Sequence, residues 1–204
     1  MKQTSCITTL AVLAFSATSA LAQAAVTPAA PTPAPARVAG SIAGHPAWPV
    51  AKPDDVKSPE AILNAVYSVI SGAKGQPRDW DRMRSLVIPD ARLIPAVAAS
   101  AANGGAAHSD AVVLSVDGYI ERSSRRLASD GFFERSVHNV TEQFGNIVQV
   151  WSTYESRHNL DDEKPFARGI NSFQLLKDGD RYWVVNIFWD SESPTKPIPA
   201  KYLP

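Results

Sequence analysis

The chain has 204 residues, and its 20 Lys and Arg balance 20 Asp and Glu, which gives a formal net charge of zero at pH 7. The sequence contains no basic stripe beyond Arg122, Arg125 and Arg126 on one short predicted helix, which argues against a nucleic-acid partner. No segment beyond the N-terminal region is long and apolar enough to span a bilayer, so no membrane span is expected.

Residues 1–22 have the features of a secretory signal peptide. Lys2 supplies a basic start, Ile7 to Leu21 are mostly apolar, and Ala20-Leu21-Ala22 is an A-x-A cleavage site. We therefore expect cleavage after Ala22 and a periplasmic or secreted mature protein. Cys6 is the only cysteine and lies in this segment, so the mature chain would have no disulfide, thiol nucleophile or thiolate metal ligand. Export without cysteines favours a bacterial periplasm.

Residues 23–57 are rich in Ala and Pro ("TPAAPTPAPARVAG", "HPAWPVAKPDD"). Prolines at this density cannot sustain a helix or a central strand, so we predict an extended, polyproline-like tether. The alternative is that Trp48 and Val50 dock on the following domain as an N-terminal arm. Residues 58–204 have the length of one domain with its own core.

Three helices are predicted at the start of this domain. Ser58, followed by Pro59 and Glu60, is an N-cap signal, and the apolar residues after it recur at helical spacing up to Ile70. Asp79 caps a second helix, and Ser115 caps a third that runs from Val116 to about Leu127. Between the second and third helices we expect an extended segment, 91–97, and a surface loop of small residues, 98–110.

Four strands follow, because the sequence becomes rich in Val, Ile, Phe, Tyr and Trp. The two-residue hairpin turns are predicted at Gly145-Asn146 and Asp178-Gly179. The strands are Phe132–Phe144, Ile147–Arg157, Gly169–Leu176 and Tyr182–Asp190. Helices followed by an antiparallel meander predict an α+β domain with the helices packed on one face of the sheet.

The predicted turn at Asp178-Gly179 places two asparagines opposite each other. With that turn, Asn171 faces Asn186 on the same side of the sheet as Phe173 and Val184. A buried amide without a partner costs roughly 1–3 kcal/mol. The two amides are therefore expected either to bond to each other or to line a small-molecule pocket.

The other hairpin brings further polar groups to the inner face. A turn at Gly145-Asn146 orients Arg135, Asn139 and Tyr154 inward, whereas Glu134 is expected outside, opposite Arg157. The expected pocket is thus apolar with a few convergent polar side chains.

Three further features concern partners. Trp183, Val185 and Ile187 are predicted to form an apolar outer surface, which suggests a homodimer through the sheet. Arg168 and Asp190 are either an ion pair at the pocket mouth or purely structural residues. His158 and residues 161–163 are interpreted as a charged hairpin loop, and no metal or cofactor motif is found.

Several strings resemble the nuclear transport factor 2-like (SnoaL-like) superfamily of cone-shaped α+β domains. They are "AVYSVISGA", "DWDRMRSLVIPDARLI", "YESRH" and "FARGINSFQLLKDGDRYWVVNIFWD". The resemblance covers Ser58 to about Glu192. It implies three N-terminal helices packed on a curved, mainly antiparallel sheet, and it is specific for fold rather than function.

The ketosteroid isomerases of this superfamily use a tyrosine and a protonated aspartate as an oxyanion hole, with another aspartate as the base. In the resemblance Tyr67 matches the tyrosine and Asn171 the proton-donating aspartate. The position of the base falls at or beside Pro95, where no carboxylate is present.

Two hypotheses follow. The first is a non-catalytic module that binds a small, partly apolar molecule or a partner, and it is favoured because no histidine or tuned carboxylate is placed in the site. The second is an acid–base lyase or isomerase of the ketosteroid isomerase or polyketide cyclase type, acting on a small hydrophobic substrate. It would use Tyr67, Arg135, Tyr154 and Asn171 with an unidentified base. A carboxylate or histidine within hydrogen-bond reach of Asn171 and Tyr67 would favour the enzyme.

Overall fold

The computed structural model describes residues 42–98 and 109–204; the predicted signal peptide, the first part of the tether and most of the small-residue loop lie outside these ranges. The helices are α1 (Pro53–Val56), α2 (Pro59–Ile70), α3 (Trp80–Leu86) and α4 (Val116–Ser129). The strands are β1 (Val87–Ala98), β2 (Ser109–Ala111), β3 (Phe133–Phe144), β4 (Ile147–Arg157), β5 (Ala167–Asp178) and β6 (Arg181–Ser191). Short 3-10 turns cover Ile42–Gly44 and Ala200–Tyr202.

The three predicted helices are confirmed with their caps. Ser58 accepts a hydrogen bond from the Ala61 N–H at the start of α2, and Asp79 accepts one from Arg82 at the start of α3. Ser115 caps α4 in the same way. The apolar face of α2 is buried in the core, as its spacing predicts.

The end of the predicted tether packs against the domain. The Trp48 indole donates a hydrogen bond to the Val87 carbonyl (2.9 Å), and both Ala51 and Val56 are buried. Val50 is 92% exposed. The alternative prediction of a docked N-terminal arm therefore holds for Trp48 and the short helix α1, but not for Val50.

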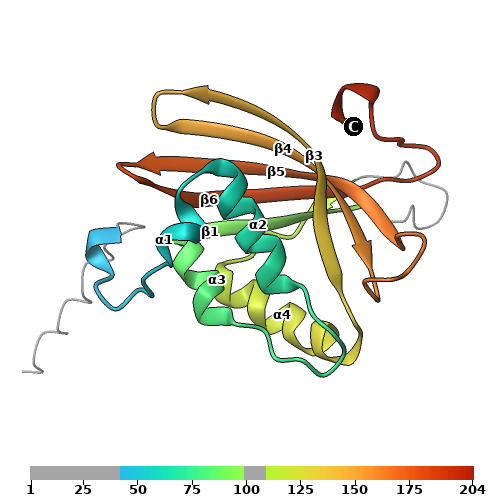
Figure 1. Ribbon diagram of the computed structural model, residues 1–204, viewed down its shortest axis with the longest axis horizontal. Helices are drawn as coiled ribbons and strands as arrows, with labels where there is room; N and C mark the ends of the chain where they lie inside the picture. The colour runs from blue at the N-terminus through green and yellow to red at the C-terminus, as the bar shows by residue number, and fades with distance from the viewer. Residues whose placement is uncertain (1–41, 99–108) are drawn as a thin grey trace, which may run out of the picture. The chain divides into compact units, whose positions relative to one another are not determined.

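The sheet has the strand order β2-β1-β6-β5-β4-β3. β1 pairs with β6 in parallel, and all other pairs are antiparallel. Figure 1 shows α2, α3 and α4 on one side of the sheet and the C-terminal segment on the other. The predicted α+β fold class is confirmed, and the core lies between the helices and this inner face of the sheet.

The β3–β4 hairpin contains a bulge that inverts the faces of its far end. Phe144 pairs with Ile147, so the two-residue turn at Gly145-Asn146 is confirmed. The register then shifts by one between Ser136 and His138. Because side chains alternate between faces, a one-residue shift moves every later side chain to the other side. Glu134 therefore points inward and Arg135 outward, the reverse of the prediction.

The β5–β6 hairpin differs from the prediction in two ways. Asp178 pairs with Arg181, so the turn consists of Gly179 and Asp180, one residue later than predicted. This displacement shifts each cross-strand partner by two residues, so every side chain stays on its predicted face. A register shift between Gln174 and Leu175 then moves the partners by one further residue, and Asn171 lies opposite Trp189.

The predicted Asn171–Asn186 pair is therefore wrong. Asn186 lies opposite Gln174 on the outer face, whereas Ile187 and Trp189 face inward. Ile187 and Trp183 are each 5% exposed, so the apolar outer surface expected from these residues is not formed. The homodimer stays a prediction without the surface on which it was based.

Candidate functional site

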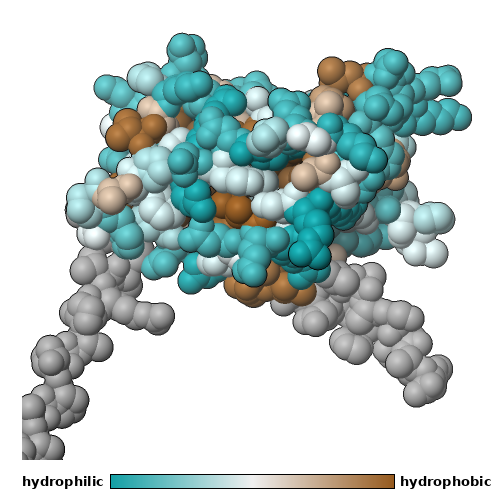
Figure 2. Space-filling model, turned by 90° about the horizontal axis from the view of Figure 1, so that it is seen from below, coloured by the Kyte–Doolittle hydropathy of each residue, from teal (hydrophilic) through white to brown (hydrophobic). Residues whose placement is uncertain are grey.

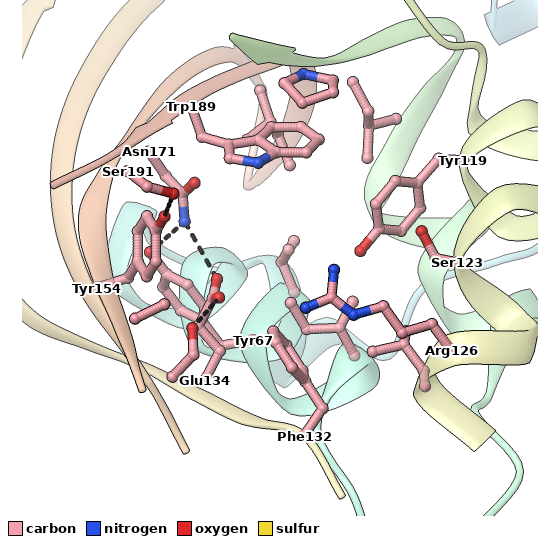
Figure 3. Close-up of a pocket in the computed structure, with 18 of the residues that line it drawn as sticks. Tyr67, Tyr119, Ser123, Arg126, Phe132, Glu134, Tyr154, Asn171, Trp189 and Ser191 are labelled. Carbon is pink, nitrogen blue, oxygen red and sulfur yellow. Dashed lines mark hydrogen bonds between the residues drawn. The ribbon is translucent and has the colours of Figure 1, made fainter. Parts of the chain in front are cut away.

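A cavity of about 320 Å³ lies between the inner face of the sheet and helices α2 and α4 (Figure 3). Its apolar lining includes Leu93, Leu127, Phe132, Ile187 and Trp189. On the face of the molecule seen in Figure 2, hydrophilic residues predominate and apolar surface shows in a hollow between them. The volume is at the lower end of the range of about 300–1,000 Å³ that is typical of small-molecule sites.

Glu134 and Asn171 form the polar centre of the sheet side of this cavity. The Asn171 amide donates to the Tyr67 hydroxyl (3.1 Å) and to Glu134 Oε1 (3.3 Å). The Ser156 hydroxyl donates to Glu134 Oε2 (2.7 Å). Both carboxylate oxygens therefore have donors, and the buried Asn171 has partners other than the predicted Asn186.

A chain of hydroxyl groups continues from Tyr67 to the surface. Ser152 donates to Ser136 (3.1 Å), and Ser136 donates to Asn139 Oδ1 (2.8 Å). Since Ser152 uses its own proton in this way, Tyr67 must donate to Ser152 (2.7 Å). Asn139 is exposed at the far end of this chain and does not line the cavity.

The hydrogen-bond donors that an oxyanion hole would need from Tyr67 and Asn171 are therefore already used within the protein. The Tyr67 proton goes to Ser152, and the two amide protons of Asn171 go to Tyr67 and Glu134. Neither residue has a donor left for an oxygen of a bound molecule. The resemblance to ketosteroid isomerases is therefore not matched by the hydrogen bonding at these two positions.

Burial raises the pKa values of three side chains on the sheet side of the cavity. It raises the pKa of Glu134 to about 7, although the hydrogen bonds from Ser156 and Asn171 oppose the change. Burial also raises the pKa of the Tyr67 hydroxyl well above its usual range. It raises the pKa of Tyr154, which is hydrogen-bonded to Ser191 (3.0 Å), to about 12. Glu134 is thus the group on this side that titrates near neutral pH.

Helix α4 supplies the other side of the cavity. Tyr119, Arg122, Ser123 and Arg126 recur at helical spacing and line it from one face of the helix. Figure 3 shows the Tyr119 hydroxyl and the Arg126 guanidinium pointing toward the cavity from this helix. The Tyr119 ring packs edge-to-face against Trp189, at 6.2 Å between centroids. Burial raises the pKa of Tyr119 above its usual range.

The predicted site residues divide into two groups. Tyr67, Tyr154 and Asn171 line the cavity. Arg135 and Asn186 do not, since the two bulges turn both residues outward, and Arg135 lies 3.5 Å from Glu155 instead.

Sequence reasoning missed Glu134 and the α4 residues. Glu134 was expected outside, opposite Arg157, but Arg157 pairs with Glu155 (2.9 Å). No local signal marks the bulge that turns Glu134 inward. The α4 residues had such a signal, because Tyr119, Ser123 and Arg126 follow the helical period of an inner face.

Of the two alternatives for Arg168 and Asp190, the ion pair between them is not formed. Arg168 lies 3.3 Å from Glu192 and 3.8 Å from Glu155. Asp190 pairs with Lys196. These contacts connect the outer side of the sheet to the C-terminal segment and leave the cavity without this ion pair.

The predicted charged loop, His158 and residues 161–163, lies between β4 and β5. Asp162 accepts hydrogen bonds from the backbone N–H groups of His158 and Asn159, which closes the loop.

Within residues 42–98 and 109–204, no group of three or more His, Cys, Asp and Glu is arranged to hold a metal ion. None of the helices in these ranges has the length and apolarity to cross a membrane.

Comparisons with known proteins give likenesses in structure only. No family model matches the chain, and no curated protein matches it. An NTF2-like protein of unknown function from Silicibacter pomeroyi is 13% identical with a TM-score of 0.41, over 65% of this chain and 91% of that one. A candidate ketosteroid isomerase from Parabacteroides distasonis is 10% identical with a TM-score of 0.45, over 71% and 99%.

A candidate calcium/calmodulin-dependent protein kinase type II association domain from Thiobacillus denitrificans is 11% identical. Its TM-score is 0.47, over 68% of this chain and 98% of that one. At these identities the likeness concerns the fold alone, and the function must be argued from the cavity.

Proposed function

We propose that the domain binds a small, partly apolar molecule in this cavity and transfers a proton to or from it through Glu134, as a lyase or isomerase. The observation that carries the proposal is the position of Glu134, a carboxylate in an apolar cavity with a pKa of about 7. A general base or acid is most effective when its pKa lies near the working pH.

The surroundings of Glu134 give it a defined geometry. Ser156 and Asn171 each bond one carboxylate oxygen, so the group is held in one orientation before a ligand enters. An oriented base avoids the entropic cost of aligning with its substrate. Charge that develops on the substrate must then be stabilised elsewhere, since the donors of Tyr67 and Asn171 are occupied. The Tyr119 hydroxyl and the Arg126 guanidinium are on the other side for this purpose.

The elimination reaction of 5-nitrobenzisoxazole tests the base directly. A base removes the C3 proton, the N–O bond breaks, and its electrons go to the phenolate oxygen, which is followed by absorbance. The rate should rise with pH and be half-maximal near pH 7, the pKa of Glu134. Glu134→Gln should lower the rate at least about a hundredfold. Glu142→Gln, at an exposed position of β3, is the control and should leave the rate unchanged.

A second candidate function is binding without catalysis. It is favoured by the composition of the described lining, in which Glu134 is the single carboxylate and no histidine is present. A reaction that needs a second carboxylate or a histidine beside Glu134 finds neither in that lining. Equal rates for the wild type and Glu134→Gln, with bound ligand detected by native mass spectrometry, would select this candidate.

We also propose that the domain works after export, on the sequence features of residues 1–22. N-terminal sequencing of the protein recovered from a bacterial periplasm should begin at Gln23. A chain that begins at Met1 and stays with the cytosolic fraction would contradict this.

A further inference from the structure

We propose that the α4 side of the cavity recognises the anionic head group of a small organic acid, with Arg126 as the main contact and Arg122 and Tyr119 beside it. This inference rests on the proposed function, because it names the class of molecule that the same cavity takes. It concerns residues that the sequence resemblance does not involve.

The partners of the arginines are the first observation. Within the described residues, every arginine outside α4 makes a hydrogen bond or an ion pair, as Arg82 does with Asp55 and Arg84 with Asp117. In the same ranges no such contact is found for the guanidinium groups of Arg122, Arg125 and Arg126 on α4. Two of these three, Arg122 and Arg126, line the cavity.

The charge balance of the cavity is the second observation. Its described lining contains two arginines and one carboxylate, Glu134. With a pKa of about 7, that carboxylate is only partly ionised at neutral pH. The cavity therefore carries an excess of positive charge. Charges within about 8 Å interact before physiological salt screens them, so an entering anion is attracted toward α4.

The placement of the groups is the third observation. In Figure 3, Arg126, Tyr119 and Ser123 lie on one side of the cavity, and Glu134, Asn171 and Tyr154 lie on the other. Trp189 and Phe132 border the space between them. A planar guanidinium presents parallel N–H donors that match the two oxygens of a carboxylate. A molecule held by its carboxylate at α4 lays its apolar body against Trp189 and brings its far end to Glu134.

The reverse orientation is unfavourable for a physical reason. It would place the carboxylate of the ligand against Glu134, and two adjacent carboxylates cannot both ionise without a large cost. The cavity therefore selects both the charge of the ligand and its direction. The reacting atom would be separated from the carboxylate by the apolar body.

Two probes of the same shape test the inference. 2-Naphthoate carries the carboxylate, and 2-naphthamide replaces it with a neutral amide; both are titrated into the wild-type protein by calorimetry. Charge-assisted hydrogen bonds should make the naphthoate bind about tenfold more tightly than the naphthamide. Added salt should weaken the binding of the naphthoate alone.

The variants separate Arg126 from the general charge of α4. Arg126→Gln should abolish the preference for naphthoate and leave the affinity for naphthamide unchanged. Arg125→Gln removes the same charge from an exposed position of the same helix that does not line the cavity, and should keep the preference. Circular dichroism should show both variants folded, since neither guanidinium makes a hydrogen bond or an ion pair within the described residues.

The outcomes also separate this inference from the proposed function. Equal affinity of the wild type for both probes would overturn the inference, and so would equal effects of the two arginine variants. If naphthamide still binds in those cases, the cavity remains a candidate binding site for a neutral molecule. A preference that depends on Arg126, with no effect of Glu134→Gln on the elimination rate, would support the anion site and overturn the acid–base role. Binding of neither probe would overturn the inference, and the elimination rates of the wild type and Glu134→Gln would then decide the proposed function alone.

Discussion

The two sides of the cavity differ in how their polar groups are satisfied. On the sheet side, the hydrogen bonds of Tyr67, Glu134 and Asn171 are made within the protein. On the helix side, Arg122 and Arg126 have no such partner in the part of the chain that the structure describes. The sheet side is therefore a fixed arrangement, whereas the helix side holds charges that a ligand can pair.

Burial explains the difference. Tyr67 and Asn171 are buried and Glu134 is half-buried. A buried polar group without a partner costs roughly 1–3 kcal/mol, so these groups need hydrogen bonds within the protein. The α4 arginines are on the exposed part of the helix, where water solvates them. A charge that water satisfies can exchange its water for a ligand at low cost, but a group within a closed network cannot.

The largest effect that we expect concerns the free energy of unfolding, which should depend on pH because Glu134 titrates at a different pH in the folded and unfolded states. Its pKa rises from 4.5 to about 7 on folding, so between these values the folded state holds a proton that the unfolded state has released. Stability from this group is complete below pH 4.5 and is lost as the pH rises through 7, by up to about 3 kcal/mol. Urea unfolding of the wild type at pH 4.5 to 8 should show this decline.

Glu134→Gln is the matched control, since its amide does not titrate. Its free energy of unfolding should be nearly constant where that of the wild type falls. The carboxylates with lowered pKa values, Asp55, Glu155 and Asp162, change stability at lower pH and in the same way in both proteins. Parallel curves for the two proteins from pH 4.5 to 8 would show that Glu134 is not a buried, titrating group.

The sequence predicts the elements of this fold well and the faces of its strands only near the turns. Caps, helical spacing and hairpin turns are local signals, and Ser58, Asp79 and Ser115 each cap the helix that they indicate. A displaced turn at Gly179 does little harm, because a shift of two residues preserves the faces.

The bulges are where the prediction of the site fails. Each inserts one residue into a strand and depends on how the sheet twists over the helices, which is a property of the assembled domain. The bulge in β3 places Glu134 instead of Arg135 on the inner face, and the bulge in β6 places Trp189 there instead of Phe188. Glu134, the carboxylate that we propose as the base, is therefore one residue away from the position expected to face inward.

The two asparagines provide a smaller effect and a direct comparison of the two faces. Asn171→Ala removes the donor to both Tyr67 and Glu134, and should lower the free energy of unfolding by about 2 kcal/mol. It should also raise the pKa of Glu134 further, because a hydrogen bond to the charged form is lost. Asn186→Ala, on the outer face, should change the stability by less than about 0.5 kcal/mol. Equal losses in urea unfolding would contradict the assignment of the two residues to different faces.

The smallest effect is expected on the helix side, and it decides whether the α4 arginines belong to the fold or to a ligand. Arg122→Gln combined with Arg126→Gln breaks no described contact, so the free energy of unfolding should stay within about 0.5 kcal/mol of the wild type. Arg82→Gln is the comparison, since Arg82 donates twice to Asp55 (2.8 and 2.9 Å) and both side chains are mostly buried. Its loss should be about 1–2 kcal/mol, as expected for charge-assisted hydrogen bonds. A double variant that loses as much as Arg82→Gln would mean that the α4 arginines hold the domain together, and the two sides of the cavity would then not differ.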